Sequence, residues 1–235
     1  MNFSIKDNIA AVRERINAAE RRSGRPENSV RLMAVSKFHP AEAVIEAAAA
    51  GQLLFGENRV QEAAGKFPEI MERFPGMELH MIGNLQTNKV RHIVGLASCI
   101  ESVDRIPLLQ EIERRCAKSD LNMRILFEFR TGEDSKSGFV SEEDMERAAA
   151  FCAEGNCPHI VPSGFMTMAP LAGDTGTVRA AFRKMRRAAE RIRAEFPMLA
   201  LDELSMGMSG DFETAVEEGS TMVRVGTAIF GERRI

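Results

Sequence analysis

The stretch Arg31-Leu32-Met33-Ala34-Val35-Ser36-Lys37 is a compact apolar run that ends in a small polar residue and a lysine. No turn-forming residue interrupts segment 30–35, which predicts a buried strand. His39-Pro40 follow at once, and because a residue before proline disfavours helical backbone, the strand should end near Lys37 and a helix begin after Pro40. Lys37 is therefore expected at the carboxyl end of the first strand of a βα repeat, the edge where parallel α/β folds carry out their chemistry.

The same alternation continues along the chain. It predicts strands at 30–35, 53–55, 79–82, 99–103, 123–129, 160–166, 201–206 and 222–225. It predicts helices at 41–50, from about 59 through 67, and at 89–96, 106–117, 141–153, 177–196 and 210–219. Eight strands alternating with helices favour a single-domain (β/α)8 TIM barrel over residues 1–235, with an open doubly wound sheet as the alternative.

An extra helix is predicted at 4–22, before the first strand. Its apolar residues Ile5, Ile9, Val12 and Ile16 recur at helical spacing and form one stripe. Nothing helical of useful length follows the eighth predicted strand. We therefore expect the N-terminal helix to cover the barrel wall left bare there.

The amino-acid composition bears on the partners and the cellular compartment of the protein. The 235 residues carry a net charge of -3, which gives no indication of nucleic acid as a partner. Four cysteines make no disulfide framework and favour a reducing, cytoplasmic setting. We expect no signal peptide, no membrane span and no bound metal, and we expect a monomer.

A phosphate site is expected in the loops after the seventh and eighth strands of a barrel. These loops contain Met208-Ser209-Gly210 and Gly226-Thr227, and Arg224 lies in the eighth strand. Small residues let backbone N–H groups approach a phosphate, and hydroxyls add donors. Each residue alone also fits a turn, a cap or a solvated charge. Their convergence with Lys37 on one rim favours a binding site for pyridoxal phosphate or for a phosphorylated carbonyl substrate.

Several blocks, in order, resemble the pyridoxal phosphate homeostasis protein family over about residues 30–231. They are Ala34-Val35-Ser36-Lys37, Gly56-Glu57-Asn58-Arg59-Val60-Gln61-Glu62, His80-Met81-Ile82-Gly83-Asn84-Leu85-Gln86-Thr87-Asn88-Lys89, Ser135-Lys136-Ser137-Gly138, Gly164-Phe165-Met166-Thr167-Met168, Leu204-Ser205-Met206-Gly207-Met208-Ser209 and Met222-Val223-Arg224-Val225-Gly226-Thr227-Ala228-Ile229-Phe230-Gly231. The resemblance implies a barrel like the N-terminal domain of alanine racemase, with pyridoxal 5'-phosphate (PLP) as cofactor.

The resemblance also implies roles for individual residues. Lys37 would form a Schiff base with the cofactor, and Arg224 would face the pyridine nitrogen. Asn58 would lie near the cofactor. The phosphate would be held by Ser209, Gly226 and Thr227. The sequence departs from the family pattern at Leu79, Asn84, Phe165 and Gly210, which puts loop details in question.

The absence of tyrosine from the chain bears on activity. Alanine racemases place a tyrosine opposite the lysine, so a two-base racemase mechanism is unsupported here. The leading interpretation is a non-catalytic carrier and buffer of PLP that passes it to PLP-dependent client enzymes and affects amino-acid and keto-acid balance indirectly. The alternatives are an amino-acid-processing enzyme with Lys37 as its base, and an aldolase-like lyase acting on a phosphorylated sugar.

Three weaker signals favour ordinary structural roles. Cys152, Cys157 and His159 match no common zinc spacing. His80 ends an apolar strand and is expected to be structural. The basic residues of the predicted helix 177–196 favour a solvated face over a docking surface for an acidic partner.

Overall fold

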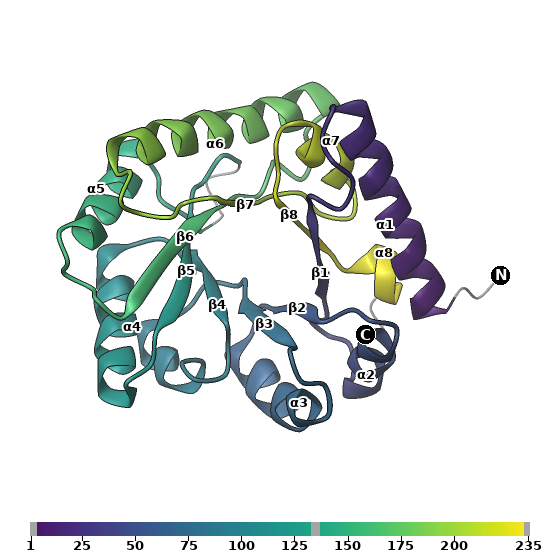
Figure 1. Ribbon diagram of the computed structural model, residues 1–235, viewed down its shortest axis with the longest axis horizontal. Coiled ribbons are helices and arrows are strands. Elements are labelled where there is room, and N and C mark those ends of the chain that lie inside the picture. Colours follow the sequence, from purple (N-terminus) through teal and green to yellow (C-terminus); the bar gives the residue numbers. More distant parts are fainter. Residues whose placement is uncertain (1–3, 133–136, 233–235) are drawn as a thin grey trace.

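The structure is a closed ring of eight parallel strands surrounded by helices (Figure 1). The computed structural model describes residues 4–132 and 137–232. The strands are β1 (Arg31–Val35), β2 (Leu54–Glu57), β3 (Glu78–Met81), β4 (Cys99–Val103), β5 (Met123–Glu128), β6 (Ile160–Met166), β7 (Glu203–Ser205) and β8 (Met222–Val225). The helices are α1 (Ile5–Arg22), α2 (Ala41–Ala49), α3 (Val60–Arg73), the 3-10 helix η1 (Thr87–His92), α4 (Ile106–Ser119), α5 (Glu142–Ala153), α6 (Thr175–Glu195), α7 (Phe212–Glu217) and α8 (Thr227–Phe230).

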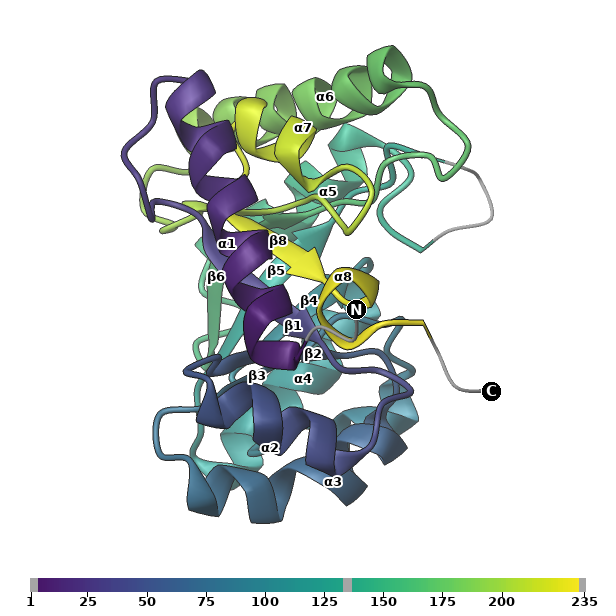
Figure 2. The same ribbon diagram turned by 90° about the vertical axis from the view of Figure 1, so that its right-hand side faces the viewer.

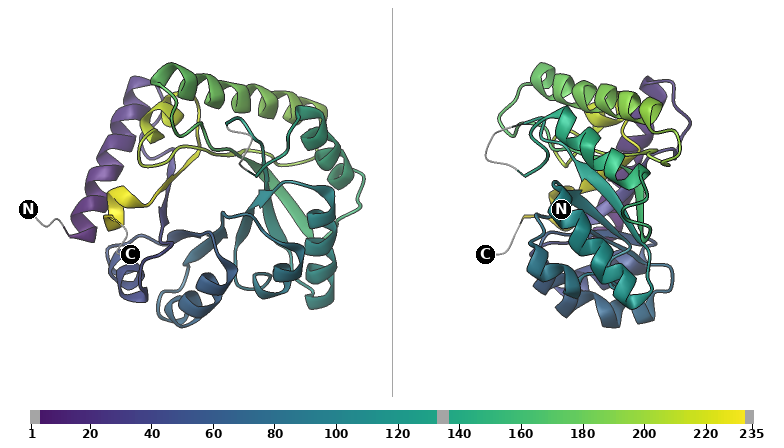
Figure 3. Two further views of the ribbon diagram at one scale, coloured as in Figure 1. Left: turned by 180° about the vertical axis from the view of Figure 1, so that it is seen from behind. Right: turned by 90° about the vertical axis from the view of Figure 1, so that its left-hand side faces the viewer.

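Pairing of the first strand with the last closes the barrel. Leu32 of β1 lies opposite Val223 of β8, in parallel register. The same ring is visible from behind in Figure 3. The closure confirms the predicted (β/α)8 barrel and excludes the open doubly wound sheet.

The N-terminal helix α1 stands where an eighth barrel helix would be. The last helix, α8, has four residues, and α1 packs against it and against α7 and α2 (Figure 2). The buried residues Ile9, Val12 and Ile16 form its inner stripe. Ser4 caps its start and accepts a hydrogen bond from the Asp7 backbone N–H, as in a capping box. The expected cover of the barrel wall is therefore confirmed.

Side chains divide into two apolar layers because successive strand residues point to opposite faces. A large core lies between the strands and the helices. A smaller one fills the barrel interior and consists of Met33, Val35, Leu54, Cys99, Leu126, Met166 and Met222. No helix within residues 4–132 and 137–232 combines the length and the apolar character needed to cross a bilayer.

The helix after β2 is longer than predicted. We expected it to end at Phe67, but α3 continues through Pro68 to Arg73. Proline cannot donate the hydrogen bond to the carbonyl of Ala64. Both Ala64 and Pro68 are exposed, so water can solvate that carbonyl and the helix tolerates the proline.

Replacing this proline should stabilise the fold. We expect Pro68→Ala to raise the free energy of unfolding by roughly 1–3 kcal/mol, because it restores a helical hydrogen bond and removes a steric clash. Urea unfolding measures the change. A loss of stability would show that the proline is needed for the path of α3.

The segment after β3 also differs from the prediction. A helix was expected at 89–96, whereas the structure has the 3-10 helix η1, which begins at Thr87 and ends at His92. An i→i+3 bond from Lys89 N to Gln86 O helps to close it. Only Val90 of its residues is buried, so little packing favours an extended α-helix.

Candidate cofactor-binding site

A cavity of about 410 Å³ opens at the carboxyl ends of the strands. Its volume lies within the range of small-molecule sites. The sequence predicted six cofactor-binding residues, and all six line this one cavity: Lys37, Asn58, Ser209, Arg224, Gly226 and Thr227. They come from the ends of β1 and β2, the loop after β7, and β8 with the turn that follows it. The structure thus brings together what the sequence placed on one rim.

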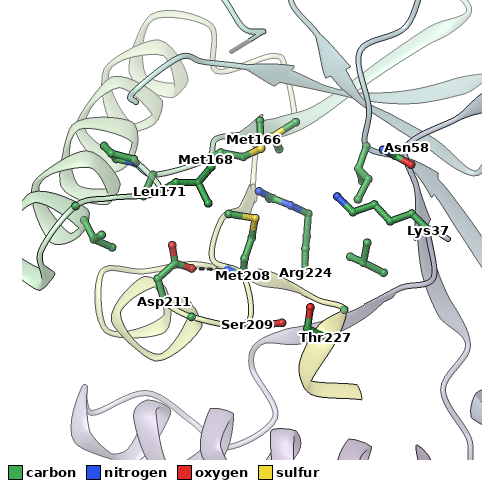
Figure 4. Close-up of a pocket in the computed structure, with 18 residues that line it drawn as sticks. Lys37, Asn58, Met166, Met168, Leu171, Met208, Ser209, Asp211, Arg224 and Thr227 are labelled. Atoms are coloured by element: carbon green, nitrogen blue, oxygen red, sulfur yellow. Dashed lines mark hydrogen bonds between the residues drawn. The ribbon is translucent and has the colours of Figure 1, made fainter. Parts of the chain in front are cut away.

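The period of two along the strands explains why Lys37 and Arg224 point inward. Met33 and Val35 belong to the interior layer, and Lys37 is the next residue on that face. Met222 is also interior, and Arg224 follows it by two. Figure 4 shows both side chains entering the cavity from these neighbouring strands.

The Arg224 guanidinium is fixed by backbone and side-chain oxygens. Its Nη1 donates to the carbonyl oxygen of Ser205 at 2.6 Å and to the Ser205 hydroxyl at 2.7 Å. Its Nη2 donates to the carbonyl oxygen of Thr167 at 2.8 Å. These contacts use three of the five N–H donors of an arginine. Among the described residues, this leaves two of its N–H donors without an acceptor.

Behind Arg224 lies a buried polar network that the sequence did not reveal. The Ser205 hydroxyl also donates to Glu101 Oε2 at 2.6 Å, and Glu101 Oε1 lies 2.7 Å from His80 Nδ1. Burial opposes the charge on Glu101, but His80 and Arg224 outweigh it and hold the pKa of that carboxyl below its usual value. His80, Glu101 and Ser205 are fully buried and do not line the cavity. His80 thus lies outside the cavity lining, and its structural role stays a prediction.

The side of the cavity formed by the loops after β7 and β8 is built from close backbone approaches. A Cβ on Gly226 would lie 3.1 Å from the carbonyl oxygen of Val35, so a glycine suits this turn. The Ser209 hydroxyl lies 3.5 Å from the backbone nitrogen of Ala228. The predicted helix 210–219 is shorter, since α7 covers only Phe212–Glu217. Asp211 lies just before α7 and accepts a hydrogen bond from Met208 N at 2.5 Å.

An apolar wall, which the sequence did not predict, completes the cavity. Its members include Met166, Met168, Leu171 and Met208 (Figure 4). Methionine side chains adapt to a ligand's shape. Met166, Met168 and Met208 lie in stretches that the sequence analysis quoted, but none was predicted to line the site. Among the departures from the family pattern, only Gly210 lines the cavity, while Leu79 and Phe165 belong to the outer core.

The cavity carries few titratable groups. Its described lining includes Lys37, Arg224 and Asp211, and no histidine, cysteine or tyrosine. Two cations against one carboxylate favour an anionic ligand.

The basic face of α6 pairs mainly with acidic residues of the same chain. Arg179 contacts Glu217 and Glu218, and Arg183 contacts Glu218. Arg191 contacts Glu142 at 2.7 Å. These ion pairs favour the ordinary role of this face over a docking surface.

Glu128 is a second buried carboxyl beneath the rim. It follows the interior residue Leu126 by two, and it is 1% exposed. Burial raises its pKa to about 7; the hydrogen bond from Ser137 opposes this rise, and the charge of Asp104 adds to it. Oε2 has no hydrogen-bond partner among the described residues.

This raised pKa predicts a pH-dependent stability. The folded state holds the Glu128 proton more tightly than the unfolded state, so this residue lowers stability as pH rises from about 4.5 to 7. The free energy of unfolding of Glu128→Gln, relative to that of wild type, should therefore increase by about 2 kcal/mol when the pH is raised from 5 to 8. Urea unfolding at the two pH values tests this, and an equal difference at both would contradict it.

Comparison with known proteins defines the family. The sequence profile described as alanine racemase, N-terminal domain, matches residues 8–234. A pyridoxal phosphate homeostasis protein of Aquifex aeolicus is 39% identical over 228 residues, covering 97% of this chain and 98% of that protein. The chain belongs to the alanine racemase N-terminal domain family. The pyridoxal phosphate homeostasis protein of Escherichia coli K12 is 38% identical over 97% of both chains.

Solved structures agree with this family membership. PipY of Synechococcus elongatus, solved with PLP bound, has 35% identity and a TM-score of 0.84, covering 97% of this chain and all of that one. An alanine racemase of Streptomyces coelicolor has a TM-score of 0.69 at 20% identity, and the match covers 58% of it. The latter likeness shows the fold alone.

Proposed function

We propose that this family member binds PLP in the cavity as a Schiff base with Lys37, and acts in PLP homeostasis as a carrier and buffer. The observation that carries the proposal is that all six predicted residues line one cavity. The likeness to PipY over its whole length, solved with PLP bound, supports it. PLP supplies an aldehyde that reacts with an amine and a ring that withdraws electrons.

The residues of the cavity fit the parts of this cofactor. Lys37 supplies the amine. The remaining donors of Arg224 suit the ring nitrogen as an acceptor, and an arginine there disfavours protonation of that nitrogen by charge repulsion. Ser209, Gly226 and Thr227 suit the phosphate, and Asn58 lies on the Lys37 side of the cavity (Figure 4).

The same residues support a non-catalytic role. An unprotonated ring is a weak electron sink, so strong carbanion chemistry is not expected. The chain has no tyrosine, and the described cavity lining has no histidine or cysteine, which leaves Asp211 as its one carboxylate. The naming of the relatives as homeostasis proteins agrees with this role.

The proposal includes a cellular compartment, an oligomeric state and client enzymes for the carrier. We place it in the cytoplasm as a monomer that gives PLP to dependent enzymes and thereby affects amino-acid and keto-acid balance. The four cysteines are free and buried thiols, which agrees with a reducing compartment.

Two assays on the PLP-loaded protein separate the carrier from an enzyme. In the first, the protein is mixed with an apo-transaminase, and we expect transaminase activity to return. In the second, it is incubated with L-alanine, and we expect no D-alanine at the 1–1000 per second typical of enzymes. Rapid formation of D-alanine would make racemase activity the function. Failure to restore the transaminase would contradict the carrier role.

A further inference from the structure

A buried ion cluster joins α3 to the turn that contains Lys37. The ammonium of Lys66 lies 2.8 Å from Glu57 Oε1, 3.0 Å from Glu62 Oε1 and 3.0 Å from the carbonyl oxygen of Ser36. The Lys66 side chain is 8% exposed and that of Glu57 is fully buried. Three acceptors match the three N–H donors of an ammonium, so this cation is fully hydrogen-bonded.

The cluster binds the turn on both sides of Lys37. On the N-terminal side, the Ser36 carbonyl oxygen accepts a hydrogen bond from Lys66, and the Ser36 hydroxyl donates to Glu57 Oε1 at 2.7 Å. On the C-terminal side, the backbone N–H of Phe38 donates to Glu62 Oε1 at 2.6 Å. Both peptide neighbours of Lys37 thus depend on the same three ionic side chains.

The turn has a conformation that needs such support. Phe38 has φ of 66°, in the left-handed region that bulky side chains rarely adopt. Its ring packs beneath Arg59, whose Cζ lies 4.9 Å from the ring centroid. The hydrogen bond from the Phe38 N–H to Glu62 helps to hold this strained residue in place.

We propose that Lys66, with Glu57 and Glu62, is a positioning group that fixes the backbone of Lys37 so that its amine meets the carbonyl carbon of the cofactor. The inference rests on the proposed Schiff base at Lys37. None of the three side chains lines the cavity.

The ion cluster is not explained by its contribution to the stability of the fold. Buried ion pairs add little stability over apolar residues of similar size, because the charges must lose their hydration. Lys37 has a long flexible side chain, and its amine reacts well only when the attack geometry is held. Fixing the backbone at both neighbouring residues reduces the positions that the amine can take.

Two variants test the cluster, with a control in the same helix. Glu62→Ala removes the acceptor of the Phe38 N–H and keeps the buried Lys66–Glu57 pair. Lys66→Met removes the cation. Glu69→Ala makes the same change as the first variant at an exposed position of α3. Each protein is mixed with saturating PLP, and two quantities are measured: the total PLP bound, by dialysis, and the share trapped on Lys37 by a short borohydride pulse after mixing.

The positioning role predicts a specific loss of trapping. In Glu62→Ala and Lys66→Met, the share of bound PLP trapped within a short borohydride pulse after mixing should fall roughly tenfold, as expected for loss of one hydrogen bond to a charged group. Hydrogen exchange of apo-protein peptides spanning 36–39 should become faster in Glu62→Ala. Glu69→Ala should match wild type in the share of trapped PLP and in hydrogen exchange at 36–39.

Other outcomes separate the two proposals. A wild-type share of trapped PLP in Glu62→Ala would overturn the positioning role, whether or not exchange at 36–39 changes. A loss confined to total binding or to melting temperature would also overturn it, because a purely structural cluster predicts that pattern. Absence of trapping in wild type would instead reject the Schiff base, and the exchange measurement would still report whether the cluster holds the turn.

Discussion

Glu101→Ala is expected to lower the free energy of unfolding by about 3–5 kcal/mol, the cost of leaving buried charge without its partner. Glu101 is fully buried and receives hydrogen bonds from Ser205 and His80. Arg224 is 4% exposed and keeps its charge, because a guanidinium does not lose its proton in proteins. Alanine would leave that cation inside the barrel and would also remove a ring partner from His80.

The unfolding measurement needs a matched substitution. Glu111→Ala removes a carboxylate that binds Arg114 and Arg115 near the surface. Surface ion pairs contribute about 0–1 kcal/mol, so this variant should remain close to wild type. If urea unfolding shows the same loss of unfolding free energy for both variants, Glu101 does not balance the charge of Arg224 inside the barrel.

Gly83→Ala is expected to weaken PLP binding at least about tenfold, or 1.4 kcal/mol. A Cβ at this position would lie 2.2 Å from the carbonyl oxygen of Asn58 and 2.7 Å from its Cα. Both are backbone atoms, so the chain after β2 or after β3 must move. Because Asn58 lines the cavity, the displacement should reach the cofactor site.

Gly210→Ala is the control for this substitution. Gly210 also lines the cavity, but a Cβ there would meet nothing within 4 Å. Equilibrium dialysis of both variants against PLP compares them directly. Similar affinities in Gly83→Ala and wild type would show that the Asn58 backbone shifts without consequence for the site.

The sequence predicted the rim of the barrel well, because the relevant signals are local. Lys37 follows an apolar run and precedes a proline, and these neighbours define the end of β1. Ser209 and Gly226 lie in loops whose place in the chain order identifies them. Each of these residues could be assigned from a few neighbours and from the fold.

The polar interior could not be predicted, because its partners are far apart in the sequence. Glu101 contacts Ser205, which lies 104 residues away. Lys66 meets the Ser36 carbonyl across 30 residues, and its position in an amphipathic helix resembles that of an ordinary surface lysine. A glutamate within the apolar strand 99–103 was an available signal, as was His80 at the end of another, since a buried polar side chain requires a partner.

The visible absorbance spectrum of the purified protein with added PLP, beside that of Lys37→Ala, tests the binding of PLP at Lys37 most directly. We expect a yellow Schiff-base band in wild type that is lost or shifted in Lys37→Ala. A wild-type protein that stays colourless with PLP present would contradict the cofactor assignment, and a phosphorylated carbonyl substrate would become the leading ligand for the cavity.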